Sequence, residues 1–211
     1  MKKIVIFDIC DTLVPENTTV GFIKYAGFFS KFSWTLLFNK VSKLFNYLIW
    51  KLFDYDFIRS CLIYQLKGLT DKELSAISDN YVAILDVNTK IEFLFKKYTC
   101  QGFDTAVCSA TINPVAESIK RKYLFDFAFS SSLFFERGVC RGKLLEDLYG
   151  KKLNIFKELR SKYDYIVFVT DNVTDAKCLQ YCDEFIAVIP EGKAKNISVW
   201  SNLNVTEVIK L

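Results

Sequence analysis

Side chains that could carry out chemistry occur in four short segments, each of which adjoins an apolar run of the chain. In chain order these segments hold Asp8, Cys10, Asp11 and Thr12, then Ser109, then Lys151 and Lys152, then Asp171 and Asp175. Carboxylates gathered with lysine and hydroxyl groups suit phosphoryl transfer. One carboxylate can attack phosphorus, acidic oxygens can hold Mg²⁺, and lysine and serine can stabilise the charge on the phosphoryl oxygens.

The chain has 211 residues and no histidine. Nucleophilic triads with an imidazole base, histidine-ligated zinc or iron, and histidine phosphorelay are therefore excluded. Catalysis must use carboxylates, amines, hydroxyls or thiols. The formal net charge of +4 is too small to indicate nucleic acid, and we expect no nucleic-acid partner.

The seven cysteines are an odd number, and Met1 is followed within two residues by a strand-like run rather than by a signal-peptide pattern. A reduced compartment accounts most simply for both observations. We therefore expect a cytoplasmic protein with free thiols.

The apolar runs have the form of buried strands, because they are short and rich in β-branched residues. They cover residues 3–7, 102–109, 165–170 and 184–189, and helical periodicity separates them at residues 114–123 and 151–163. Strands that alternate with helices indicate a parallel sheet, whose ligands gather at the carboxyl ends of the strands. We predict an α/β fold with a Rossmann-like three-layer core, in which the four polar segments meet.

A long helical stretch interrupts this alternation directly after the first strand. It predicts an inserted all-helical cap at residues 15–97, which leaves residues 1–14 and 98–211 as the α/β core. Leu74, Ile77, Tyr81 and Leu85 form one helical stripe near its end. A second departure is a small hairpin at residues 132–144, where a Glu-Arg-Gly turn separates two apolar runs.

Residues 17–53 of the cap contain no Asp or Glu, five lysines and eleven aromatic residues. The lysines interrupt every window long enough to span a bilayer. One interpretation is a cap whose aromatic residues form their own core while its lysines face water. The other is a basic amphipathic surface that makes peripheral contact with an anionic membrane.

The order of the polar segments on this α/β pattern resembles the haloacid dehalogenase superfamily. FDICDTL resembles its first motif, AVCSA its second, YGKKLNIF its third and VTDNVTDA its fourth. The cap after the first motif and the hairpin are similar to the phosphoserine-phosphatase-like branch, some members of which act on lipid phosphates. The resemblance covers almost the whole chain and implies a Mg²⁺-dependent phosphatase for a small phosphorylated substrate, with a lipid phosphate as one candidate.

The resemblance also implies roles for single residues. Asp8 would be the nucleophile that becomes an aspartyl phosphate, and Thr12 would close its motif. Ser109, Ala110 and Lys152 would bind the phosphoryl group, with Lys151 as the alternative lysine. Asp8, Asp171, Asp175 and the backbone carbonyl of Cys10 would hold Mg²⁺.

The chain departs from the family pattern at Cys10, where phosphatases of the family have the aspartate that protonates the leaving group and then activates water. A thiol with an ordinary pKa of about 8.5 suits that cycle poorly. Asp11 could take over only if the loop is distorted, because adjacent side chains on an extended chain point apart. The alternatives are a slow phosphatase, a phosphotransferase, and a catalytically weakened relative that binds a membrane or partner.

Two substrates are disfavoured by other residues. Dehalogenases of the superfamily also lack the second aspartate, but they need no metal and Asp171 retains the metal-ligand position. Phosphoserine is disfavoured as the substrate because the position that carries an acid to hold its amino group in that branch is Asn17 here, beside Glu16.

Overall fold

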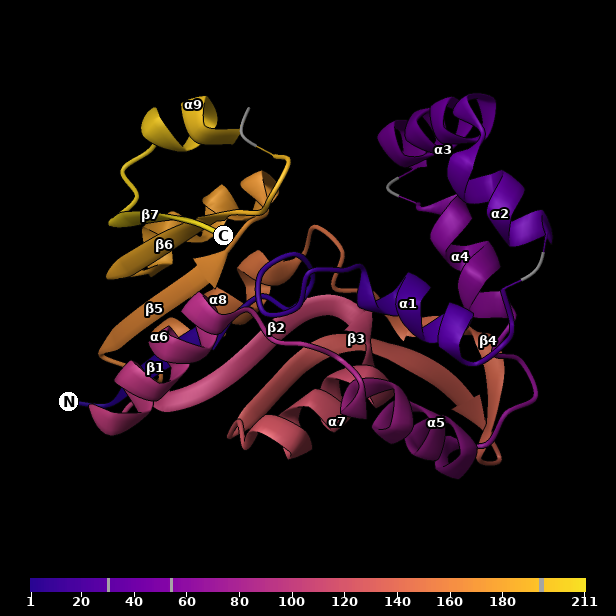
Figure 1. Ribbon diagram of the computed structural model, residues 1–211, viewed down its shortest axis with the longest axis horizontal. Coiled ribbons are helices and arrows are strands. Elements are labelled where there is room, and N and C mark those ends of the chain that lie inside the picture. The colour runs from indigo at the N-terminus through magenta and orange to yellow at the C-terminus, as the bar shows by residue number, and fades with distance from the viewer. Residues whose placement is uncertain (30, 54, 194–195) are drawn as a thin grey trace.

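The computed structural model describes residues 1–29, 31–53, 55–193 and 196–211, without the side chains of residues 31, 32 and 34. Its centre is a seven-stranded sheet in the order β4-β3-β2-β1-β5-β6-β7 (Figure 1). All neighbouring strands are parallel except β3 and β4. The strands are β1 (Lys3–Phe7), β2 (Asp104–Ile112), β3 (Phe127–Glu136), β4 (Val139–Glu146), β5 (Tyr165–Thr170), β6 (Glu184–Ile189) and β7 (Glu207–Lys210).

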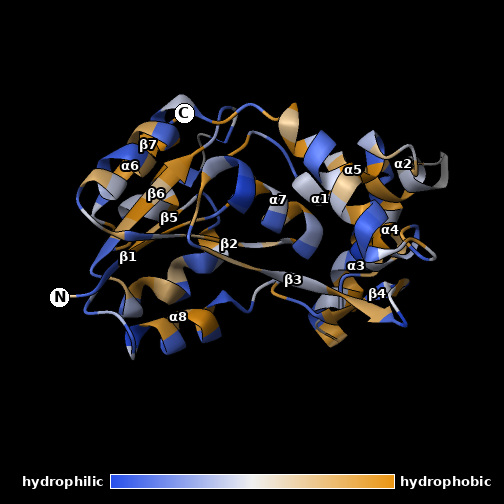
Figure 2. Cartoon of the chain, turned by 90° about the horizontal axis from the view of Figure 1, so that it is seen from below, coloured by the Kyte–Doolittle hydropathy of each residue, from blue (hydrophilic) through white to orange (hydrophobic). Residues whose placement is uncertain are grey.

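Helices cover both faces of this sheet, which confirms the predicted three-layer α/β class. Figure 2 shows α6 (Thr89–Cys100) and α7 (Asn113–Tyr123) on one side and α8 (Lys152–Arg160) on the other. The side chains of β1 alternate between the two layers, as in any strand. Val5 and Phe7 enter the core under α6 and α7, whereas Ile4 and Ile6 pack with Phe156 of α8. Burial on both faces explains why residues 4–7 of β1 are all apolar.

The chain after β5 contains elements that the sequence pattern does not indicate. A 3₁₀ helix, η1 (Val173–Tyr181), follows β5, and α9 (Asn196–Ser201) precedes the edge strand β7. Three of the four residues of β7 are exposed, so no buried apolar run marks it.

The described residues between β1 and α6 form five helices: α1 (Thr18–Tyr25), α2 (Lys31–Phe38), α3 (Lys40–Phe53), α4 (Phe57–Tyr64) and α5 (Asp71–Ala83). Helices α2, α3 and α4 stand together at one end of the molecule, away from β5, β6 and β7 (Figure 1). Asn17 caps α1, and a capping box between Thr70 and Glu73 starts α5. Among the described residues of this insert no strand is formed; residues 30 and 54 of the predicted cap lie outside the description.

The predicted end of the cap at residue 97 falls inside α6, which is a helix of the core. The ring of Phe95 lies 4.7 Å from that of Phe125 and 6.2 Å from that of Phe7 on β1, measured between centroids. An amphipathic helix looks the same in sequence whether it covers a cap or a sheet. These contacts place the end of the insert before Thr89.

A hairpin lies where the sequence predicts one. Arg137 and Gly138 have φ of 51° and 75°, the left-handed values of a tight two-residue turn. The paired strands extend past the predicted residues 132–144, because the first half of β3 is also hydrogen-bonded in parallel to β2.

Candidate active site

The site is organised around Asp8, which follows β1 in the middle of the sheet. Its backbone N–H donates to the carbonyl of Val169 at 2.9 Å, so the β1–β5 ladder continues to this residue. Lys152, at the start of α8, donates to Asp8 Oδ2 at 2.6 Å and to Asp175 Oδ2 at 2.7 Å. All three side chains are at least nine-tenths buried. One ammonium between two carboxylates supplies the pairing that buried charges require.

The shared lysine controls the protonation of this cluster. Burial alone would lower the pKa of Lys152, but Asp8 and Asp175 outweigh it and hold the pKa above its ordinary range. Burial raises the pKa of Asp175, while Lys152 opposes that rise. The ammonium therefore stays charged at neutral pH and lies between the two carboxylates.

Thr170 is a residue of this cluster that the sequence analysis missed. Its hydroxyl lies 2.9 Å from Asp175 Oδ2 and 3.3 Å from Asp8 Oδ2, and it accepts the N–H of Asn172 at 3.1 Å. A hydroxyl residue ending an otherwise apolar buried strand is the signal that could have found it.

Thr12 and Asp171 form the second part of the site. The N–H of Asp171 donates to Thr12 Oγ1 at 2.9 Å, and that hydroxyl donates back to Asp171 Oδ1 at 3.3 Å. Burial and the charge of Asp8 raise the pKa of Asp171 to about 6, with Lys193 in partial opposition. Thr12 therefore positions Asp171, and Asp171 lies close enough to Asp8 for the two charges to interact.

Lys193, in the loop between β6 and α9, is a further site residue with no signal in the sequence. It donates to Asp11 Oδ2 at 2.7 Å and to Asp171 Oδ2 at 3.1 Å. Asp11 has a φ of 56°, a left-handed value that is uncommon outside glycine. The loop is thus distorted at this residue, and both Cys10 and Asp11 line the cavity described below.

Cys10, in the loop that follows β1, contacts the first helix of the insert. Its sulfur accepts the N–H of Thr18 at 3.4 Å and lies 3.2 Å from the Thr18 hydroxyl, which in turn donates to Thr111 at 2.8 Å. Burial and the charge of Asp8 raise the pKa of the Cys10 thiol, although the Thr18 hydrogen bonds oppose the rise. The thiol is therefore neutral near pH 7 and does not act as a base.

Ser109 and Ala110 lie near the end of β2, where the register to β3 shifts after Ser109. The Ser109 hydroxyl is buried and lies 4.0 Å from the Cys10 sulfur. The carbonyl of Ala110 accepts hydrogen bonds from Ser131 at 3.0 Å and from Arg59 of α4. Of the two candidate lysines, Lys152 is buried in the site and Lys151 is exposed.

Arg59 was not predicted as a site residue. Its guanidinium forms an ion pair with Asp147, hydrogen-bonds the Ala110 carbonyl and donates to Ser131 at 3.0 Å. It therefore joins the insert to the core beside Ser109. Arg59 and Asp147 are 88 positions apart in the sequence, so no local pattern could reveal the pair.

A cavity of about 640 Å³ lies above these residues, a size suited to a small-molecule ligand. Its floor comes from the core and its roof from α1, α2, α3 and α4 of the insert. Residues that line it include Asp8, Cys10, Asp11, Ser109, Lys152, Asp171 and Asp175 from the core and Leu37, Lys43, Asn46, Ile58, Arg59 and Leu62 from the insert.

The donor atoms fit a hard divalent cation at Asp8 and Asp171. These two buried carboxylates repel each other, as the raised pKa of Asp171 indicates, and oxygen donors are what Mg²⁺ prefers. The backbone carbonyl of Cys10 is a third oxygen of the same loop. Among the described residues no group of three or more His, Cys, Asp and Glu side chains is gathered for a metal. In particular, Asp175 is engaged by Lys152 and Thr170.

Comparison with known families agrees with this geometry. The sequence pattern of haloacid dehalogenase-like hydrolases matches residues 5–180. The chain belongs to this family of hydrolases. Its first motif at Asp8 and its fourth at Asp171 and Asp175 both lie inside the matched range. No curated protein matches the chain closely.

Solved structures share the fold of this haloacid dehalogenase-like hydrolase at low sequence identity. A HAD family hydrolase from Salmonella enterica serovar Typhi has a TM-score of 0.70 at 16% identity, covering 99% of this chain and 66% of its own. A phosphoserine phosphatase, solved as a phospho-aspartyl intermediate analogue, has a TM-score of 0.66 at 19% identity, covering 99% and 93%. One from T. onnurineus has a TM-score of 0.62 at 19% identity, covering 100% and 90%. The predicted resemblance is thus confirmed for family and fold.

Proposed function

We propose that this hydrolase is a Mg²⁺-dependent phosphomonoesterase that acts through an aspartyl phosphate on Asp8. The observation that carries the proposal is the buried Asp8–Lys152–Asp175 cluster, which opens into the cavity with Asp171 beside it. Two buried carboxylates around one ammonium, next to a third carboxylate, match the needs of phosphoryl transfer.

In the first step a carboxylate oxygen of Asp8 attacks phosphorus while the ester P–O bond breaks, and the leaving alcohol takes up a proton. Lys152 stabilises the charge that develops on the phosphoryl oxygens, and Ser109 supplies a hydroxyl at the same end of the sheet. Asp175 and Thr170 hold Lys152 and Asp8 in place. In the second step water attacks phosphorus, the bond to Asp8 breaks, and the carboxylate is restored.

Asp8, Asp171 and the Cys10 carbonyl would hold the metal, and Thr12 would orient Asp171 through its two hydrogen bonds. When bound, Mg²⁺ supplies positive charge that offsets the repulsion between the Asp8 carboxylate and the phosphate dianion.

Proton transfer is the weak point of this site, because the neutral Cys10 thiol replaces a carboxylic acid. Asp11 lies in the cavity wall and is the nearest carboxylate in sequence, but Lys193 contacts its Oδ2 at 2.7 Å. This ion pair would have to break before Asp11 could exchange a proton with the substrate through that oxygen. Turnover is therefore expected to be slow for substrates with poor leaving groups.

The direct experiment measures phosphate release from a panel of phosphomonoesters with Mg²⁺, comparing wild type with Asp8→Asn. Turnover by wild type and its loss in the variant, together with a phosphoryl group trapped on Asp8 after acid quenching, are expected. Equal rates for the two proteins across the panel would rule the proposal out and favour the weakened, ligand-binding relative that Cys10 suggests.

A phosphomonoester carried by a lipid is the narrower substrate candidate. Lys43 and Asn46 of α3 and Leu37 of α2 line the cavity, so the roof combines a cation with apolar surface. Comparing a short-chain lipid phosphate with a polar phosphomonoester of similar size tests this choice. A higher kcat/KM for the lipid is expected, and equal values would remove the preference.

A further inference from the structure

Helix α3 has no buried residue, although most of its side chains are apolar. Val41, Leu44, Leu48 and Leu52 recur every three or four residues and therefore lie along one side of the helix. Their exposed fractions are 74%, 62%, 48% and 73%. This aliphatic stripe is an unusual feature for a surface helix, because such a helix normally turns its apolar side to the core.

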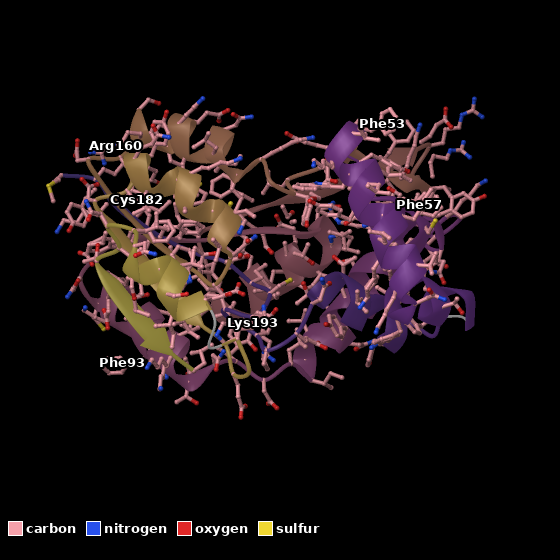
Figure 3. The ribbon with its side chains drawn as sticks, turned by 90° about the horizontal axis from the view of Figure 1, so that it is seen from above. Phe53, Phe57, Phe93, Arg160, Cys182 and Lys193 are labelled. Carbon is pink, nitrogen blue, oxygen red and sulfur yellow. The ribbon has the colours of Figure 1, made fainter. Side chains whose placement is uncertain are left out.

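The packing of α3 explains why the aliphatic stripe stays outside. On its inner side, the side-chain oxygen of Asn46 accepts the N–H of Ile58 at 2.8 Å, and at the edge of the stripe the ring of Phe45 lies 6.0 Å from that of Phe57, measured between centroids. Figure 3 shows Phe53 and Phe57 at the end of the molecule opposite Phe93, Arg160 and Cys182. The stripe therefore faces outward on an element fixed from behind.

The charge of the same segment is of one sign. Residues 17–53 contain five lysines and no acidic residue, and exposed Lys40, Lys43 and Lys51 all belong to α3. On a helical projection Lys40 and Lys51 flank the aliphatic stripe along one edge. Long lysine side chains beside an apolar face can place their amines at headgroup level while the apolar side chains enter the acyl boundary.

This charge pattern also distinguishes the possible occupants of the surface. If a second copy of the chain packed its α3 on this one in antiparallel fashion, Lys40 of each would approach Lys51 of the other, and like charges would oppose association. An anionic bilayer instead offers apolar and negatively charged surface together. No helix among the described residues is long and apolar enough to cross a membrane, so the contact would be peripheral.

We propose that α3 docks this protein on anionic membranes, with the aliphatic stripe in the interfacial layer and Lys40 and Lys51 at the headgroups. The opposite side of α3 contributes Lys43 and Asn46 to the active-site cavity. Docking would therefore place the roof of the cavity next to the lipid surface. The proposal concerns binding alone and does not depend on phosphatase activity.

The test is flotation of the full chain with phosphatidylcholine vesicles, with and without phosphatidylserine. Binding to the anionic vesicles at low salt is expected, and each charge reversal at Lys40 or Lys51 should weaken it by at least about five-fold. The matched control reverses Lys157 and Lys177, which are exposed lysines of the core. Their reversal should leave the affinity for vesicles within about two-fold, because neither side chain would contact a headgroup. Failure to float at low salt would overturn the proposal.

Apolar insertion is tested with Leu44→Ser plus Leu52→Ser, and Phe93→Ser is the control. Leu52 and Phe93 are similarly exposed, at 73% and 69%, but Phe93 lies at the opposite end of the molecule from Phe53, the last residue of α3 (Figure 3). The leucine variant should lose flotation while Phe93→Ser retains it, and circular dichroism should show both of them folded. Equal flotation of the leucine variant and wild type, or a soluble dimer that the leucine variant dissociates, would refute membrane docking.

Discussion

Replacing Cys10 by aspartate should raise the rate of phosphomonoester hydrolysis. The sulfur already occupies a polar position, because it accepts the N–H of Thr18 at 3.4 Å and lies 3.2 Å from the Thr18 hydroxyl. A carboxyl at this place can accept the same N–H and, when protonated, donate to the Thr18 hydroxyl, whose own proton goes to Thr111. It would also face Asp8, whose charge favours the protonated form of the new acid.

The size of the expected rate increase follows from the protonation states of the Cys10 thiol and of the aspartate that replaces it. A thiol with a pKa of about 8.5 is roughly 3% ionised at pH 7, and burial lowers that fraction further. A positioned acid and base contributes roughly 10²–10⁴-fold. We expect about 10²-fold, or about 2.7 kcal/mol of transition-state stabilisation, because the negative field of Asp8 limits the base form of the new carboxyl.

The assay compares kcat/KM for an alkyl phosphate and for an aryl phosphate with a good leaving group. The gain should be larger for the alkyl phosphate, since only that leaving group needs a proton. Cys10→Asn is the matched control, with a similar shape and no titratable group. If Cys10→Asn accelerates hydrolysis as much as Cys10→Asp does, or if Cys10→Asp slows hydrolysis, Cys10 has a different role and the proposed mechanism is wrong.

Two further predictions concern stability. Lys152→Met leaves Asp8 and Asp175 buried without a charged partner, so urea unfolding at pH 7 should lose about 3 kcal/mol; the deficit should shrink at acid pH as Asp175, whose pKa burial raises, takes up a proton, whereas Lys157→Met on the exposed side of α8 should change little. Burial alone would raise the pKa of Asp183, but hydrogen bonds from Arg160 and a backbone N–H hold it below its ordinary range, so its stabilisation is present at neutral pH and is lost as the pH falls through that lower pKa. Asp183→Asn should therefore cost about 1 kcal/mol at pH 7 and nothing well below pH ~3.9, and an equal cost at both pH values would contradict this linkage.

The residues that the sequence could place are those tied to the ends of buried strands. Asp8 and Asp171 follow β1 and β5, whose apolar runs are unmistakable, and parallel neighbours bring their carboxyl ends together. The register of Leu153 and Phe156 also favours Lys152 over Lys151, and the structure buries Lys152.

What sequence reasoning could not place depends on contacts between distant segments. Lys193 reaches Asp11 across 182 positions, and its own neighbourhood has no periodic pattern. The membership of α6 in the core was invisible for a related reason, since its apolar side is the same whichever surface it covers. The left-handed backbone of Asp11 likewise arises from the fold around it, because aspartate adopts that conformation only occasionally.

The Arg59 contacts hold the insert against the core. Arg59 belongs to the insert, and its partners Asp147, Ser131 and the Ala110 carbonyl belong to the core. Any opening of the roof to admit substrate or release phosphate must break this ion pair and expose the largely buried guanidinium to water. Discrete contacts therefore define a closed arrangement of insert and core, and any opening would be an activated step separate from the chemistry proposed at Asp8.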